Sequence, residues 1–125
     1  MFKHQRIVPL DAEKTFSRLR NLLKDRGFVI LSFVDIQEIM KNAFSEKFEP
    51  YFILEVCKPA AARELIGLDR DFGLLLPCKV VIDQRGNETT VSMLRVSEMA
   101  KATMGNHEKE PVKYENEIVE AIDSI

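Results

Sequence analysis

Runs of apolar residues alternate with amphipathic stretches along the chain, and this alternation predicts strands separated by helices. Strands are expected where β-branched and aromatic residues cluster between turn residues. Five segments have this character: 3–8, 28–34, 51–57, 78–83 and 88–94. The run 28–34 is almost free of polar residues, so we expect it to be a central strand covered on both faces.

Helices are predicted between these strands, where apolar residues recur at three- and four-residue steps. Asp11 and Asp35 precede two such stretches, and each carboxylate is suited to cap the first free amides of a helix. Gly27 is a suitable end for the first helix. Pro59 is expected at the first position of a third helix, where its missing amide proton costs nothing. Ser97 is the predicted cap of a fourth.

A last helix is predicted to open at Pro111 and to carry one apolar stripe. Glu115 is the only residue that breaks this stripe. We expect the stripe to face the core rather than a partner. Its apolar members are Val112, Ile118, Val119, Ile122 and Ile125.

The predicted order is strand, helix, strand, helix, strand, helix, hairpin, helix, helix. Helices between the first three strands suggest crossovers, whereas the turn at 84–87 joins the last two strands as an antiparallel hairpin. No repeat and no long linker divides the chain. The sequence therefore predicts a single domain over 1–125 of the α+β class, a two-layer sandwich with a mixed sheet of about five strands.

Composition disfavours two classes of partner. Lys and Arg total 18 against 20 for Asp and Glu, so the net charge of −2 provides no attraction for nucleic acid or an anionic membrane. The apolar runs are far shorter than the ~20 residues that span a bilayer. The N-terminal residues show no export signal, and we expect a cytoplasmic protein.

Two cysteines, each close to a proline at a strand boundary, are the best candidate chemistry. Cys57 precedes Lys58 and Pro59, and Cys78 follows Pro77. Without a secretory context, free thiols are favoured over a disulfide. The start of the third helix and the Lys58 ammonium would stabilise a thiolate at Cys57. The alternative is that both cysteines are small buried hydrophobic residues.

Metal binding and nucleophilic catalysis have little support. If the two cysteines lie on neighbouring strands, they supply only two of about four zinc ligands, and His4 and His107 stand near the chain ends. No histidine lies near either cysteine in sequence, and no glycine-rich phosphate motif is present. Asp69, Asp71 and Asp83 are expected to be solvated loop carboxylates. No metal site is predicted, and no cofactor is assigned.

The middle of the chain resembles the family called domain of unknown function 302. The resemblance is carried by residues 28–35, by 51–59 with its Cys-Lys-Pro ending, by Ala62 and Leu65, and by the leucine-rich segment 73–80 with its Pro-Cys pair. The family commonly has asparagine where this chain has Lys58. The resemblance implies a two-layer α/β domain that forms homodimers, and it implies no settled activity.

Two function classes follow. The leading hypothesis is a pocket bounded by Cys57, Lys58, Pro59, Pro77 and Cys78 that binds a small-molecule ligand or exchanges thiols, with Cys57 as the more acidic thiol and Cys78 as its resolving partner or a pocket wall. The rival is a non-enzymatic structural or protein-interaction module in which both cysteines belong to the core. Whether the chain is an enzyme is left open at this stage.

Overall fold

One five-stranded sheet organises the chain, and the computed structural model describes residues 1–125 of it. The predicted α+β class and the predicted order of strands and helices are confirmed. The strands are β1 (Lys3–Val8), β2 (Val29–Asp35), β3 (Tyr51–Cys57), β4 (Cys78–Arg85) and β5 (Glu88–Leu94). The helices are α1 (Ala12–Asp25), α2 (Ile36–Phe44), α3 (Pro59–Leu68), α4 (Val96–Thr103) and α5 (Val112–Asp123), with a 3₁₀ helix η1 (Arg70–Leu74) after α3.

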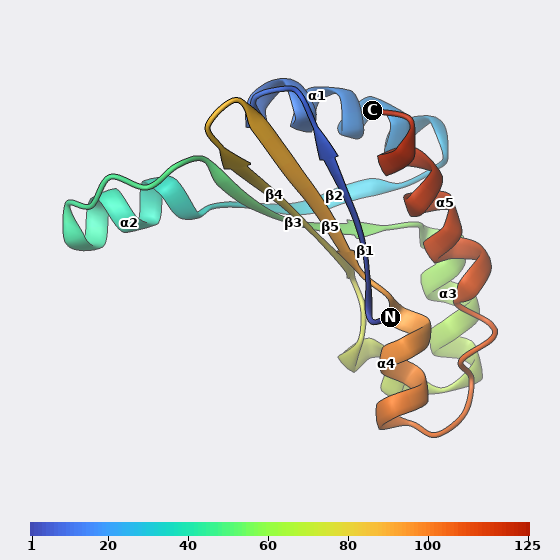
Figure 1. Ribbon diagram of the computed structural model, residues 1–125. Helices are drawn as coiled ribbons and strands as arrows, with labels where there is room; N and C mark the ends of the chain where they lie inside the picture. Colours follow the sequence, from blue (N-terminus) through green and yellow to red (C-terminus); the bar gives the residue numbers. More distant parts are fainter.

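The sheet is antiparallel throughout, so the prediction of a mixed sheet is wrong. Its strand order is β1-β5-β4-β3-β2, and each neighbouring pair runs in opposite directions. Only α1 carries the chain across the sheet, and the two parallel strands that it joins lie at opposite edges (Figure 1). The helices α2 and α3 lie beyond the ends of the strands, and each returns the chain to an adjacent, antiparallel position. The helices α2 and α3 thus connect neighbouring antiparallel strands, where the sequence suggested crossovers between parallel strands.

Strand β2 is an edge strand, not the covered central strand that its apolar run predicted. Val29, Leu31 and Phe33 are 50%, 58% and 44% exposed. A bulge between Ile30 and Ser32 shifts the register against β3, so side chains on either side of it do not follow simple alternation. The run is apolar because β2 combines core contacts with an exposed apolar surface.

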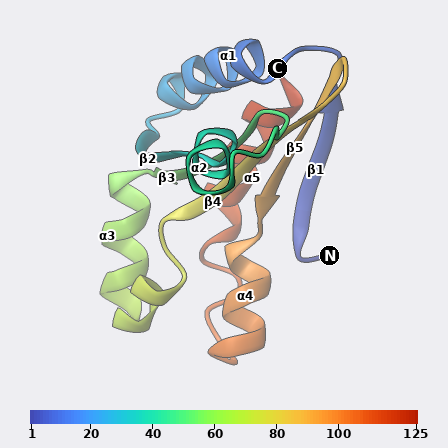
Figure 2. The same cartoon turned by 90° about the vertical axis from the view of Figure 1, so that its left-hand side faces the viewer.

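Helices α1 and α5 cover one face of the sheet, which we call the core face (Figures 1 and 2). Alternate residues of each inner strand point into this layer, as strand geometry requires. A smaller apolar cluster lies between α3, η1 and α4 and consists of Leu65, Phe72, Val96 and Ala100. The main core includes Leu19, Leu23, Phe52, Leu54, Val56, Val80, Ile82, Val91, Met93, Ile118 and Ile122.

No helix lies over the opposite face, which we call the outer face (Figure 1). Its side chains alternate with the buried ones and are half-buried or exposed. They include Val34, Tyr51, Ile53, Glu55, Lys79, Val81 and Asp83. No helix of the protein has the length and apolar character needed to cross a bilayer.

Several helix ends follow the predicted caps. Asp11 accepts a hydrogen bond from the amide of Lys14 at 2.8 Å, and Asp35 accepts one from the amide of Glu38 at 3.1 Å. Pro59 stands at the start of α3. The fourth cap was predicted wrongly. Arg95 precedes α4, and Ser97 lies inside its first turn.

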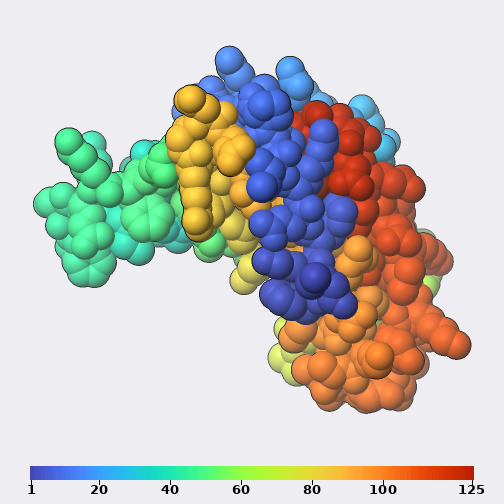
Figure 3. Space-filling model, viewed as in Figure 1, coloured from blue at the N-terminus to red at the C-terminus, as the bar shows by residue number.

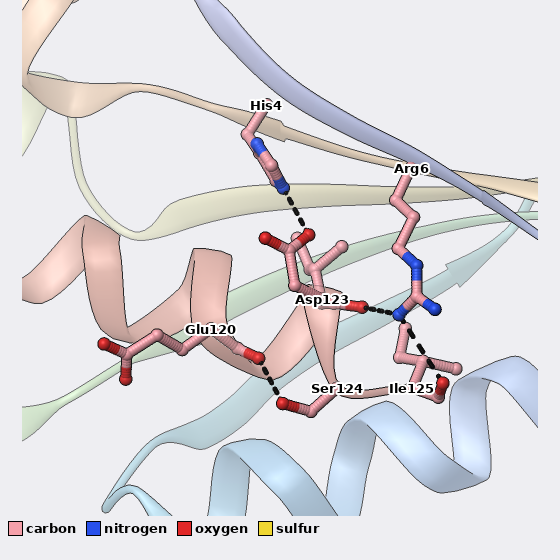
Figure 4. Close-up of polar contacts among 7 residues, drawn as sticks. His4, Arg6, Glu120, Asp123, Ser124 and Ile125 are labelled. Carbon is pink, nitrogen blue, oxygen red and sulfur yellow. Dashed lines mark hydrogen bonds and ion pairs between the residues drawn. The ribbon is translucent and has the colours of Figure 1, made fainter.

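Helix α5 is fastened to β1 at its C-terminal end (Figure 4). The His4 ring nitrogen Nε2 lies 2.8 Å from an Asp123 carboxylate oxygen. Arg6 donates to the Ile122 carbonyl at 2.9 Å and to the Ile125 carbonyl at 3.5 Å. A cation at this end adds a donor to the last carbonyls of the helix and complements the helix dipole.

Candidate functional site

An apolar crevice lies where β3 ends and β4 begins. Val56 pairs with Cys78 across these strands, so Cys57 and Cys78 come from the same end of adjacent strands. Ten of the fourteen lining residues are hydrophobic, and they come from β3, α3, the segment before β4, α4 and the start of α5. Cys57, Lys58, Pro77 and Cys78 all line the crevice, whereas Pro59 does not.

The crevice is small. Its volume is about 20 Å³, which is room for a single water molecule. Pockets that bury a typical metabolite or cofactor have roughly 300–1,000 Å³. In this conformation the space is too small for a whole metabolite and suits a water molecule or a small apolar probe.

Neither thiol forms a disulfide. Burial raises the pKa of Cys57, in the direction opposite to that predicted from the nearby helix start and Lys58. Burial also raises the pKa of Cys78 to about 12, and the Glu115 carboxylate and the Cys57 thiol add to this effect. For both thiols the largest cause of the shift is the loss of water around the sulfur, which disfavours the charged thiolate.

The Lys58 ammonium interacts with Glu117 and Phe28. It forms an ion pair with Glu117 of α5 at 2.7 Å and lies 5.7 Å from the centre of the Phe28 ring. Lys58 therefore ties the start of α3 to α5 across the crevice.

Glu115 is the residue at this site whose role the sequence did not reveal. It is only 2% exposed. Its carboxylate accepts hydrogen bonds from the Ser97 amide at 2.8 Å, the Ser97 hydroxyl at 2.7 Å and Arg95 at 3.2 Å. The signal was present in the sequence, because Glu115 is the one charged residue in the apolar stripe of α5.

The rim of the crevice is braced between α3 and α5. The Tyr114 hydroxyl donates to Glu64 at 2.8 Å, and Lys113 donates to the same oxygen at 3.0 Å. The Tyr114 hydrogen bond and then that of Lys113 lower the pKa of Glu64. Tyr114 also lines the crevice, so these bonds connect its lining to Glu64 of α3.

The remaining candidate ligands are dispersed. No group of three or more His, Cys, Asp or Glu side chains is placed to hold a metal ion. His107 lies 3.2 Å from Glu110 and next to the Phe72 ring, remote in the fold from the His4–Asp123 pair. Asp69 accepts from the amide of Asp71 at 2.9 Å. Asp83 pairs with Arg85 at 3.3 Å.

The family described as "Domain of unknown function DUF302" matches residues 4–125. The chain belongs to this family. A crystal structure of an uncharacterised conserved DUF302 protein from Bacillus stearothermophilus is similar over 98% of this chain and 97% of that one, with a TM-score of 0.90 and 26% sequence identity. No curated protein matches the chain. The predicted family resemblance is thus confirmed, and neither match assigns an activity to the crevice.

Proposed function

We propose that this DUF302 chain is a non-enzymatic protein-interaction module that associates with a second copy of itself. The observation that carries the proposal is a set of half-buried or exposed apolar side chains on the outer face and on α2 that no element of the chain covers. Soluble monomers rarely expose large contiguous apolar patches, and such patches mark interaction surfaces.

The outer face provides one half of this surface. Val34, Ile53 and Val81 are register partners across β2, β3 and β4, so their side chains form one apolar row. Val29 and Leu31 are further exposed apolar residues of the edge strand β2. An antiparallel sheet can leave one face to water, but an apolar row on that face gains free energy when a second layer covers it.

The other half is an arm, residues 36–50, which consists of α2 and the return segment to β3. Helix α2 contains no buried residue, and residues 41–49 are all exposed. Phe44 is 67% exposed and Ile39 is 45% exposed. A nine-residue helix is marginal in water by itself, and most helices are stabilised by packing an amphipathic face. We therefore expect the apolar face of the arm to pack against a surface of another molecule.

Charge balance favours a second copy over a strongly charged partner. The outer face carries three cations and three carboxylates, so it has no net charge. Glu55 and Lys79 are direct neighbours in register, so each already lies beside an opposite charge within its own sheet. The six residues are Lys3, Lys79, Arg85, Glu55, Asp83 and Glu88.

Light scattering coupled to size-exclusion chromatography tests self-association directly. The expected mass of the wild-type protein at 10–100 µM, a range chosen to cover roughly micromolar dissociation constants, is twice the 14.4 kDa of one chain. Val81→Glu should lower this mass toward the monomer, whereas Ser17→Glu, on the exposed side of α1, should not. A wild-type protein that stays at 14.4 kDa throughout would refute the proposal.

Ligand binding at the crevice is a second candidate, favoured by the convergence of Cys57, Lys58, Pro77 and Cys78 on one space. The ligand would be apolar and of only a few atoms, because of the crevice volume. Xenon is a suitable probe, and its binding should shift the NMR signals of Val56 and Ala61 but not those of Ile7. Unshifted signals under xenon pressure would remove this candidate.

Thiol exchange at the same place is disfavoured by the raised pKa of both cysteines. The free thiols are compatible with a cytoplasmic location, which we retain as a proposal.

A further inference from the structure

We infer that the two copies exchange arms, so that α2 of each copy packs on the outer face of the other. This inference rests on the proposed self-association and adds to it the element that makes the contact. Helix α2 extends from the ends of β2 and β3 well away from its own body (Figure 1). The space-filling view shows a broad recess between the arm and the part of the molecule formed by α4 (Figure 3).

Hydrogen bonds fix the base of the arm, so its extended position is a defined part of the fold. The Glu49 carboxylate accepts a hydrogen bond from the Gly86 backbone amide at 2.8 Å. The Gln84 backbone amide donates to the Pro50 carbonyl at 3.0 Å. Gln37 bridges the two limbs of the arm by donating to the Phe48 carbonyl at 2.9 Å. These bonds fix the arm to the β4–β5 turn and keep it away from its own sheet.

The apolar stripe of the arm matches the outer face in size. Apolar residues recur along α2 at the spacing of one helix face. A helix of nine residues is ~13 Å long. Three strands spaced ~4.8 Å apart span ~10 Å, which is the width of the Val34, Ile53 and Val81 row. The stripe consists of Ile36, Ile39, Met40, Ala43 and Phe44.

Charge does not oppose this contact. The arm carries two cations, Lys41 and Lys47, and three carboxylates, Glu38, Glu46 and Glu49, so its net charge is −1. The outer face, with three cations and three carboxylates, is neutral. In a two-fold dimer the contact occurs twice, and each occurrence joins one arm to one face. A change in the arm and a change in the face therefore damage the same contact from opposite sides.

Complementation between two variants tests the exchange. Phe44→Lys alters the arm, and Val81→Glu alters the face. Each variant alone should dimerise at least tenfold more weakly than wild type. In an equimolar mixture, the heterodimer has one wild-type contact and one contact that places Lys opposite Glu. The mixture should therefore recover a dimer at concentrations where either variant alone is monomeric. Leu74→Lys, an exposed apolar site on η1, is the matched control and should dimerise like wild type.

The outcomes separate the inference from the proposed function. If wild type is a dimer and Phe44→Lys dimerises equally well, self-association stands and arm exchange is wrong. Recovery in a mixture of Phe44→Lys with Phe44→Glu, but not with Val81→Glu, would mean that arm meets arm and would also overturn the inference. A monomeric wild type defeats both. Circular dichroism spectra of the variants should match that of wild type, which shows that a monomeric variant is folded.

Discussion

The Glu115 carboxylate binds Ser97 twice, through the backbone amide at 2.8 Å and the hydroxyl at 2.7 Å. Helix α4 has no side-chain cap of its own at Arg95. A residue from α5 thus supplies the acceptor that a local N-cap would provide, next to the positive end of the α4 dipole. This one carboxylate couples the last two helices to each other.

We expect Glu115→Ala to be among the most destabilising single substitutions in the chain. It removes a buried acceptor and leaves the Ser97 amide and hydroxyl without partners. Breaking a buried charged network costs ~3–5 kcal/mol, and Arg95, which is partly exposed, can recover some hydration. Glu120→Gln is the matched control, since that carboxylate of α5 is largely exposed. Urea denaturation measures both, and equal stability of the two variants would contradict the role given to Glu115.

The sequence predicted well those features that depend on neighbouring residues. Asp11 and Asp35 cap helices because the acceptor lies three residues from the amide that it binds, and that spacing is visible in a sequence. Pro59 opens α3 for an equally local reason. The cap at Ser97 failed because its true partner, Glu115, lies eighteen residues away and reaches it only through the packing of α5.

The features that sequence did not reveal depend on which strands become neighbours. The apolar run of β2 is compatible with a buried central strand and with an edge strand that offers an apolar surface. Only the antiparallel return of the chain through α2 places β2 at the edge. The same limit applies to Cys57, because the burial that raises its pKa depends on how the chain packs around the end of β3 and is not visible in the local sequence.

Both cysteines should react slowly with iodoacetamide in the folded protein at pH 8. An unfolded thiol with a pKa of ~8.5 is about one-quarter thiolate at this pH, whereas a pKa of about 12 leaves Cys78 almost entirely protonated. Labelling of Cys78 should therefore be at least ~100-fold slower than in 6 M guanidinium. Peptide mass spectrometry assigns each site. Labelling of folded Cys57 faster than that of a cysteine peptide would restore the acidic thiol that the sequence suggested.

Removal of the Arg6 side chain should loosen the end of α5. Arg6→Ala deletes the donor to the Ile122 carbonyl, with an expected loss of ~1–2 kcal/mol in the free energy of unfolding. Arg6→Lys retains the charge and should lose less. Arg18→Ala, at an exposed position on α1, should change stability by under ~0.5 kcal/mol. Hydrogen exchange at residues 122–125 should accelerate in Arg6→Ala alone, and unchanged exchange there would show that the contact does not hold the helix end.

The pKa of Cys78 predicts how stability depends on pH at the alkaline end. The folded pKa, about 12, is above that of the unfolded thiol, ~8.5. The stabilisation is therefore complete below pH ~8 and is lost as pH rises, because the unfolded state releases the Cys78 proton first. By pH 10.5 the loss should be on the order of 2–3 kcal/mol.

Cys78→Ala isolates this effect, since the variant shares every other titrating group with wild type. Wild type is expected to be more stable than Cys78→Ala at pH 7, because the substitution removes a packed side chain. The difference should narrow between pH 8.5 and 10.5. Guanidinium denaturation of both proteins across this range measures it. A difference that stays constant with pH would mean that water reaches the Cys78 sulfur in the folded protein, and the crevice would then be open to small polar molecules.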